Sequence, residues 1–384
     1  ALARTGHLLE RYRPLARLLN RVNPPAEPEL AVEVADSERR RSVTPVAEKQ
    51  APAAELKTTL QHPTGEGPRY RHYRGGDVTV FVPGNLSDYR ESLEAKHAAA
   101  ADVTRRLEAE AYDRQVGEDP PDDIEETIAA LPSMTATLET MAEEMAAAGT
   151  ETLIVDLRDN PGGDSQFVFH LAYALEGWDG VARTTEQVRL VRRRTEPYRR
   201  QYGGGGAGDA SPDPDNPYGY DFSGFIESGT GTAGTGHVPV VRQRLRQSPT
   251  ATEFVERVDE KGLYSPEQLV VVVSAGTMSS AFAGAAQLTS LDAEVVGVPP
   301  GQSPVSFGEH VERQLPNTGL DVRLAGSMYH WLADPEGDIL EPDCELTPAR
   351  FEQYGCADDA GLRLAFEHAG YGSEPREPDS SGGS

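Results

Sequence analysis

Residues 152–165 read TLIVDLRDNPGGDS, and residues 269–288 read LVVVVSAGTMSSAFAGAAQL. In each stretch a short run of mainly β-branched apolar residues ends in a turn with polar residues and glycine, and a helical pattern follows. Strands that alternate with helices through short turns indicate an α/β fold. The two stretches therefore predict two core strands, each followed by a tight turn and a helix.

Both turns carry residues that suit chemistry as well as structure. Ser279 and Ser280 open the alanine-rich helical pattern, where backbone N–H groups stabilise developing negative charge. The alternative for Ser279 is a helix N-cap without chemistry, because serine is also preferred there. Gly162 and Gly163 let backbone N–H groups approach a ligand, although a purely structural strand-to-helix turn would use the same glycines.

Three ordered motifs in the chain resemble the C-terminal processing, or tail-specific, serine proteases, which share a catalytic core with the tricorn protease. The first motif is Asp-Leu-Arg-x-Asn-x-Gly-Gly, and the second is Gly-Thr-x-Ser at a helix start. The third is similar to the Gly-Glu-Pro-Thr-Gly-Gly and Leu-Pro-Asn-Ser-Gly-Leu stretches of one bacterial branch, and the whole resemblance covers roughly residues 75–364. The matching residues are Asp156, Leu157, Arg158, Asn160, Gly162 and Gly163, then Gly276, Thr277, Ser279 and Ser280, then residues 295–301, 307–309 and 315–320.

The resemblance implies a crotonase-like α/β core, a ββα superhelix, with Ser279 as the nucleophile. It also implies that the N–H groups of Gly163 and Ser280 form an oxyanion hole, with Gly162 in the same turn. Arg158 is expected to pair with a nearby carboxylate rather than to clamp the terminal carboxylate of a peptide.

The general base is where the chain departs from many family members, which activate the serine with a lysine about 25 residues downstream. The aligned position here is Pro304, and the four lysines are Lys49, Lys57, Lys96 and Lys261. A serine–lysine dyad is therefore rejected.

The tricorn-like branch instead uses a histidine from an earlier segment and a glutamate near the end of the core. The position that matches the glutamate is Glu336, ahead of Pro342-Asp343. The histidine has no clean counterpart, and that family residue usually lies ahead of the core. The internal alternatives are His237, His310 and His330, of which His310 is assigned as the base. Each of the three could also be an ordinary surface or half-buried imidazole.

Composition limits the partners and the surroundings. Lys and Arg number 36 against 62 Asp and Glu, a formal charge of −26, which argues against nucleic acid or an anionic membrane as a partner. Acidic excess with only 4 lysines fits adaptation to high salt, while a GC-rich genome is the plain alternative. No clustered metal ligands and no cofactor motif occur, and the two cysteines, Cys344 and Cys356, form either a disulfide or free thiols. An extracellular or cell-envelope location is slightly favoured, and the sequence leaves homo-oligomer formation open.

Three regions are predicted along the chain. Residues 1–67 read as a basic amphipathic helix over about 1–21 and a Pro- and Ala-rich linker, as at the end of an upstream domain. Residues 68–372 form the catalytic core, with a first strand at 78–82, helices at about 87–116 and 122–148 that Pro132 interrupts, a flexible insertion at 202–236 and a hairpin at 309–324. Residues 373–384 read as a disordered tail. Helices fill the place where many relatives carry a PDZ-type segment.

The sequence thus predicts a serine-type peptidase that cleaves peptides or unfolded protein tails through an acyl-enzyme intermediate. The main alternative is an inactive crotonase-like module that binds a ligand or peptide, because no base is identified. Acyl-CoA chemistry on the same fold is a weaker third alternative, since it rarely needs a serine nucleophile after a Gly-Thr turn.

Overall fold

The computed structural model describes residues 30–33, 40–43, 60–99, 101–186, 188–193, 225–228, 238–332 and 339–372. The predicted N-terminal helix, the C-terminal tail and all of the predicted insertion except the strand β7 (Phe225–Ser228) lie outside these residues.

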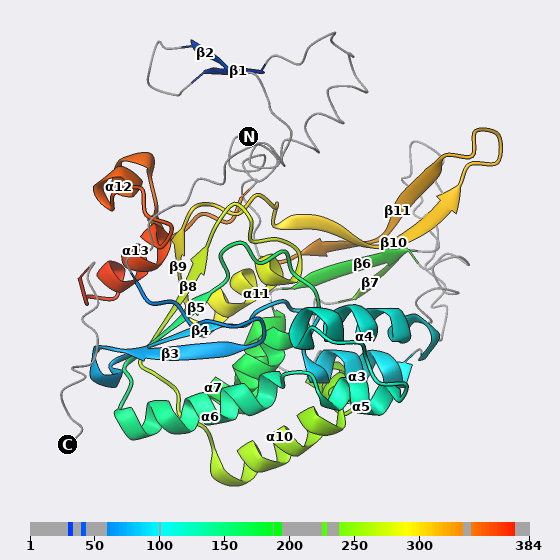
Figure 1. Ribbon diagram of the computed structural model, residues 1–384, viewed down its shortest axis with the longest axis horizontal. Helices are drawn as coiled ribbons and strands as arrows, with labels where there is room; N and C mark the ends of the chain where they lie inside the picture. Colours follow the sequence, from blue (N-terminus) through cyan, green and yellow to red (C-terminus); the bar gives the residue numbers. More distant parts are fainter. Residues whose placement is uncertain are drawn as a thin grey trace.

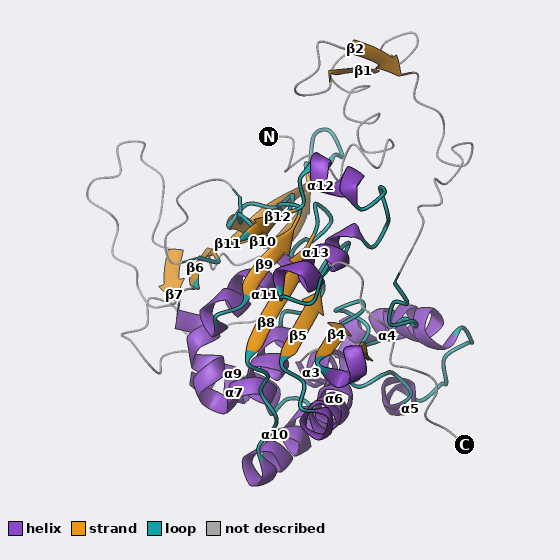
Figure 2. Ribbon diagram, turned by 90° about the vertical axis from the view of Figure 1, so that its left-hand side faces the viewer, coloured by secondary structure: helices purple, strands orange, loops and turns teal. Residues whose placement is uncertain are grey.

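The core of the fold is a six-stranded sheet in the order β12-β9-β8-β5-β4-β3 (Figure 1, Figure 2). Neighbours are parallel throughout, except that β3 and β4 are antiparallel. The two strands predicted from the opening stretches are confirmed and lie side by side, with Val155 opposite Val271. The strand bounds are Arg69–Tyr73 (β3), Val78–Val82 (β4), Thr152–Asp156 (β5), Gln268–Val273 (β8), Glu294–Gly297 (β9) and Cys344–Glu345 (β12).

Both faces of the central strands are buried, which explains their unbroken apolar sequences. Side chains alternate along a strand, so Val271 and Val273 pack in one core cluster while Val270 and Val272 pack in another. The first cluster includes residues of α6, α7, α10 and α11, and the second includes residues of α13. Figure 1 shows α13 on the upper side of the sheet and α6 and α10 below it. The helices on both faces confirm the α/β class.

Four helices occupy the chain between β4 and β5, where two helical patterns were predicted. The first pattern is divided into α3 and α4, and the second is interrupted at Pro132 as predicted, since α5 ends ahead of it and α6 begins after it. The buried Glu91 carboxylate accepts hydrogen bonds from the N–H groups of Met134 and Thr135 over 3.0 Å each, and so joins α3 to the first turn of α6. The bounds of these helices are Arg90–Ala99 (α3), Ala101–Val116 (α4), Ile124–Ala129 (α5) and Met134–Ala148 (α6).

The remaining helices lie around the later strands. The helix predicted after the glycine turn is confirmed, and it continues through a kink at Gly177, where φ is 61°. These helices are Gln166–Glu186 (α7), Val238–Leu245 (α9), Pro249–Lys261 (α10), Ser280–Leu288 (α11), Pro348–Gln353 (α12) and Ala360–His368 (α13), with 3₁₀ turns at Arg74–Gly76 (η1) and Thr289–Leu291 (η2). No helix in the described part of the chain is long and apolar enough to cross a membrane.

A second, four-stranded antiparallel sheet has the order β10-β11-β6-β7. The predicted hairpin is confirmed and is longer than expected, since Val305 at its start pairs with His330 at its end. The strands are Arg189–Arg193 (β6), Phe225–Ser228 (β7), Val305–Gln314 (β10) and Asp321–His330 (β11), and a separate hairpin joins Leu30–Glu33 (β1) to Arg40–Val43 (β2).

Candidate active site

The two predicted turns meet at the carboxyl edge of the central sheet, because β5 and β8 are parallel neighbours. The turn after β5 runs to Gly163, and the turn after β8 runs to Ser279. Ligands of open α/β sheets bind outside the carboxyl ends of strands. This edge is therefore where a functional site is expected.

Ser279 has backbone angles of φ 54° and ψ −121°, which residues other than glycine rarely adopt. The serine caps elsewhere in the chain differ: Ser133 and Ser248 have extended backbones, and each side chain accepts a hydrogen bond from a helix N–H group. Ser279 makes no such bond. The plain N-cap interpretation of Ser279 is therefore disfavoured, and its geometry is that of a serine held on a sharp strand-to-helix turn.

The surroundings fix this backbone conformation. The Ser279 N–H donates to the side-chain oxygen of Gln302 over 2.6 Å, and the N–H of Met278 donates to the carbonyl of Asn160 over 2.9 Å. Such a backbone costs of order 1–3 kcal/mol and persists only where the structure around it holds it. Two independent hydrogen bonds do so here.

Gly162 lies directly against the serine turn. A Cβ atom added at Gly162 would lie 2.6 Å from the Ser279 Cβ atom and 2.7 Å from the Ser280 nitrogen. At Gly163, the same atom would lie 2.5 Å from the backbone of Leu86 and Ser87. Both glycines also have positive φ values, 93° and 150°, so no other residue fits either place.

The N–H groups of Gly163 and Ser280 donate to no other residue in the described part of the chain. The hydroxyl of Ser280 donates to the Gly163 carbonyl over 2.8 Å and so joins the two turns beside these N–H groups. Free N–H groups held on a rigid frame are what an oxyanion requires.

Buried polar side chains brace the two turns internally. The side chain of Asn160 donates to the Gly84 carbonyl over 2.8 Å and accepts from the Gly162 N–H over 3.0 Å. The fully buried Thr277 hydroxyl donates to the Leu157 carbonyl over 2.7 Å. These bonds explain why asparagine and threonine stand at these motif positions.

Asp164, the residue after Gly163, is held from helix α3. Its carboxylate accepts a hydrogen bond from the hydroxyl of Ser92 over 2.8 Å, and that hydroxyl accepts one from the Lys96 ammonium group, also over 2.8 Å. The other carboxylate oxygen accepts from the N–H of Gln166 over 3.0 Å at the start of α7. The chain from Lys96 to Asp164 therefore ties the glycine turn to two helices.

Arg158 pairs with the buried carboxylate of Asp156 through two hydrogen bonds of 2.9 and 2.7 Å, which confirms the predicted structural pairing. Although burial opposes it, this guanidinium holds the pKa of Asp156 below its usual value. The ring of His62 lies beside the pair, with its Nε2 atom 2.7 Å from Arg158 Nη2 and 3.4 Å from Asp156 Oδ2. Burial lowers the pKa of His62, which keeps this imidazole neutral near pH 7.

Comparison with known families agrees with this geometry. The family model described as peptidase family S41 matches residues 127–330, which include both turns and the β10–β11 hairpin. The chain belongs to peptidase family S41. This is a family of serine peptidases, so the family assignment supports a hydrolase that acts on peptides or proteins.

Solved structures resemble this S41 chain only weakly. A lipoprotein from Streptococcus agalactiae is 11% identical with a TM-score of 0.37, over 76% of this chain and 69% of that one. The photosystem II D1 C-terminal processing protease is 16% identical with a TM-score of 0.27, over 57% and 40%. Mature CPAF is 15% identical with a TM-score of 0.36, over 80% and 55%. The S41 chain thus spans between 40% and 69% of the length of these proteins, and no curated protein matches it.

The predicted histidines of this S41 chain lie in different places. His310 is exposed and lies five residues along β10 from Val305, about 17 Å at the rise of a strand. His330 lies opposite Val305 in the hairpin, and Val305 follows by three residues the Gln302 that contacts Ser279. His237 and Glu336 lie outside the described residues.

The sequence analysis did not single out His62, which the structure attaches to the turn after β5. One signal for it was present, because the family histidine usually lies ahead of the core and His62 lies ahead of β3. Its contact partner Arg158 is 96 residues away in sequence, so the juxtaposition itself was not readable.

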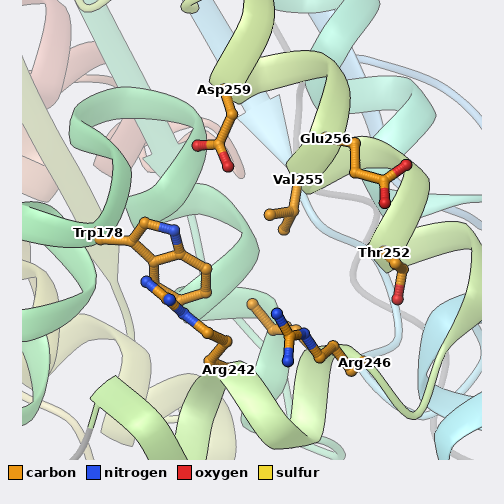
Figure 3. Close-up of a pocket in the computed structure, with 8 residues that line it drawn as sticks. Trp178, Arg242, Arg246, Thr252, Val255, Glu256 and Asp259 are labelled. Atoms are coloured by element: carbon orange, nitrogen blue, oxygen red, sulfur yellow. The ribbon is translucent and has the colours of Figure 1, made fainter.

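Other features of the S41 chain lie apart from this edge. A cavity of about 280 Å³ between α7, α9 and α10 is lined by charged side chains and by Trp178, over which Arg242 lies 4.3 Å from the ring centre (Figure 3). None of its lining residues belongs to the predicted site. Among the described residues no three ligating side chains are grouped to hold a metal ion, and Cys344 and Cys356 are both free thiols.

Proposed function

We propose that this chain is a serine endopeptidase that cleaves peptides or unfolded protein tails through an acyl-enzyme intermediate. The observation that carries the proposal is the strained Ser279, held against Gly162 at the meeting point of the two turns. The family assignment supports the reaction class, and the position of Ser279 beside free N–H donors supports its proposed role as the nucleophile.

In the proposed reaction, the Ser279 hydroxyl oxygen attacks the carbonyl carbon of the scissile peptide bond. The N–H groups of Gly163 and Ser280 stabilise the oxyanion, and a histidine takes the hydroxyl proton and passes it to the leaving amine. Water then hydrolyses the ester and releases the serine.

The base is proposed to be a histidine, in the manner of the tricorn protease. His62 is one candidate, because it is neutral near pH 7 and lies beside the Asp156 carboxylate. His310 and His330 are the alternatives, and Glu336 is proposed to assist the base. The proposal has four further parts. The peptidase prefers the tails of its substrates, its core is crotonase-like, residues 68–372 form one catalytic domain, and the protein is adapted to high salt.

The test is hydrolysis of a chromogenic tetrapeptide amide in multimolar KCl by the wild type and by single variants. Ser279→Ala is expected to lower kcat by about 10⁴- to 10⁶-fold, and alanine at the true base is expected to lower it comparably. The variants His62→Ala, His310→Ala, His330→Ala and Glu336→Gln separate the candidates. A folded wild type without turnover on any peptide would favour the binding-module alternative.

A further inference from the structure

The β10–β11 hairpin carries most of the exposed large apolar side chains of the described part of the chain. Five large apolar side chains are exposed in the described part of the chain, and four of them belong to this hairpin. These four are Phe307 at 63%, Leu315 at 41%, Leu320 at 62% and Leu324 at 58% exposed. Scattered exposed leucines are ordinary, but a group on one element marks a surface that binds something.

These side chains share one face of the hairpin. The register pairs Phe307 with Met328 and Val311 with Leu324, and the same register places Leu315 beside Leu320, where a backbone hydrogen bond of 2.8 Å joins them. Residues an even number apart on a strand point to the same side of the sheet. An apolar face therefore runs along the hairpin, interrupted by Glu309 and Arg313.

The opposite face is polar and carries both signs of charge. Glu312 and Arg323 face each other in the register and form an ion pair of 2.7 Å. Gln314 and Asp321 form the next pair toward the turn. The hairpin is thus amphipathic in cross-section. On its apolar side Val311 is buried, whereas Phe307, Leu315, Leu320 and Leu324 are exposed to water.

The apolar face starts beside the proposed active site and leads away from it. Gln302, which accepts the hydrogen bond from Ser279, lies three residues before Val305 at the start of β10. Figure 1 shows the hairpin extending away from the six-stranded sheet. Ten residues of strand span about 33 Å. A polypeptide lying along this face would reach the neighbourhood of Ser279 at one end.

Two partners could cover such a face, a second copy of this chain or a substrate polypeptide, and net charge favours the second. At physiological ionic strength a second copy of the chain would bring another formal charge of −26, so that two copies repel each other. An apolar or basic polypeptide meets no such repulsion. A folded protein buries most of its large apolar side chains, whereas an unfolded segment offers several of them in sequence to an extended face.

We propose that the apolar face formed by Phe307, Leu315, Leu320 and Leu324 is a docking surface for extended, apolar segments of unfolded polypeptide substrates. The inference deepens the proposed peptidase function and rests on it. A segment bound there is remote from the scissile bond. The face is therefore proposed to increase the affinity for long substrates without changing the rate of the chemical step.

The test compares a long and a short substrate. Leu320→Asp with Leu324→Asp is expected to lower kcat/KM for reduced, carboxamidomethylated lysozyme at least about tenfold through KM, and to leave a tetrapeptide amide unchanged. Four residues span about 13 Å and do not reach these leucines. The matched control is Gln314→Asp with Arg323→Gln, which changes the charge of the other face by the same amount and is expected to have little effect.

Binding is also measured without turnover, with each hairpin variant combined with Ser279→Ala. Each of these chains is titrated into labelled, unfolded lysozyme, and the fluorescence anisotropy of the label reports binding. The leucine variant is expected to bind at least about tenfold more weakly than its parent. Equal losses in the leucine and control variants, or a loss on the tetrapeptide as well, would overturn the proposal. So would a dimer that the leucine variant dissociates while binding of unfolded lysozyme is unchanged. Failure of the peptidase function would appear differently, as binding without any turnover by the wild type.

Discussion

Substitution of Gly162 by alanine tests how closely the glycine turn and the serine turn must fit. The added Cβ atom would lie 2.6 Å from Ser279 Cβ, 2.7 Å from the Met278 carbonyl and 2.7 Å from the Ser280 nitrogen. Carbon atoms pack at about 3.5–4.0 Å, so the turns must separate by about 1 Å. A displacement of that size at a catalytic site costs about 10²-fold, and loss of one oxyanion donor costs about 10²- to 10³-fold. Gly162→Ala is therefore expected to lower kcat by about 10²- to 10³-fold.

Gly149→Ala is the matched control. Gly149 caps α6 with φ 71°, and an added Cβ atom there has nothing within 4 Å. Both substitutions place alanine at positive φ and are expected to lower the free energy of unfolding by about 1 kcal/mol or more, but only Gly162→Ala disturbs the site. The assay is kcat on a tetrapeptide amide, together with thermal unfolding of each chain. Wild-type kcat in a folded Gly162→Ala chain would refute the reasoning, and so would an equal loss of kcat in Gly149→Ala.

Three further predictions concern polar groups that are buried or partly buried. Ser92→Ala and Lys96→Met remove the hydrogen bonds that hold Asp164 beside the glycine turn, and each is expected to lower kcat about tenfold with little change in KM. Lys96→Arg is expected to restore kcat. A change confined to KM would contradict this positioning role. Burial lowers the pKa of His170, so the imidazole binds a proton at a higher pH in the unfolded chain than in the folded one, and the free energy of unfolding falls as the pH drops below about 6.5. In urea titrations, His170→Leu is expected to reduce this dependence of the unfolding free energy on pH by up to about 1.4 kcal/mol per pH unit. An unchanged dependence would contradict the prediction. Arg158→Met leaves the Asp156 carboxylate buried without its partner and is expected to cost about 3–5 kcal/mol near neutral pH, an effect that should shrink in the double variant with Asp156→Leu.

The elements that could be predicted are those whose local sequence determines them. The β-branched runs of β5 and β8 and the break at Pro132 were visible in this way. The strand β3 was not, because its sequence RYRHY is polar and because, among the described strands, it pairs with β4 alone at the sheet edge. The kink at Gly177 was also missed, since a single glycine within a helical pattern does not reveal whether the helix ends or bends.

The candidate site divides in the same way. Ser279, Gly162 and Gly163 were readable because each turn is a short, continuous motif. The support from Ser92 was not readable, because it lies 72 residues from Asp164 and depends on how the fold places α3 beside the glycine turn. Long-range juxtaposition of ordinary polar residues leaves no local signal, so these positions required the structure.

The central claim is that Ser279 is an activated nucleophile. The most direct measurement is treatment of the folded chain in multimolar KCl with a fluorophosphonate probe, followed by mass-spectrometric location of the adduct. We expect a single adduct on Ser279 that is absent from the Ser279→Ala chain and slower to form in Gly162→Ala. A folded wild type that takes up no probe, or one labelled at a different serine, would contradict the account.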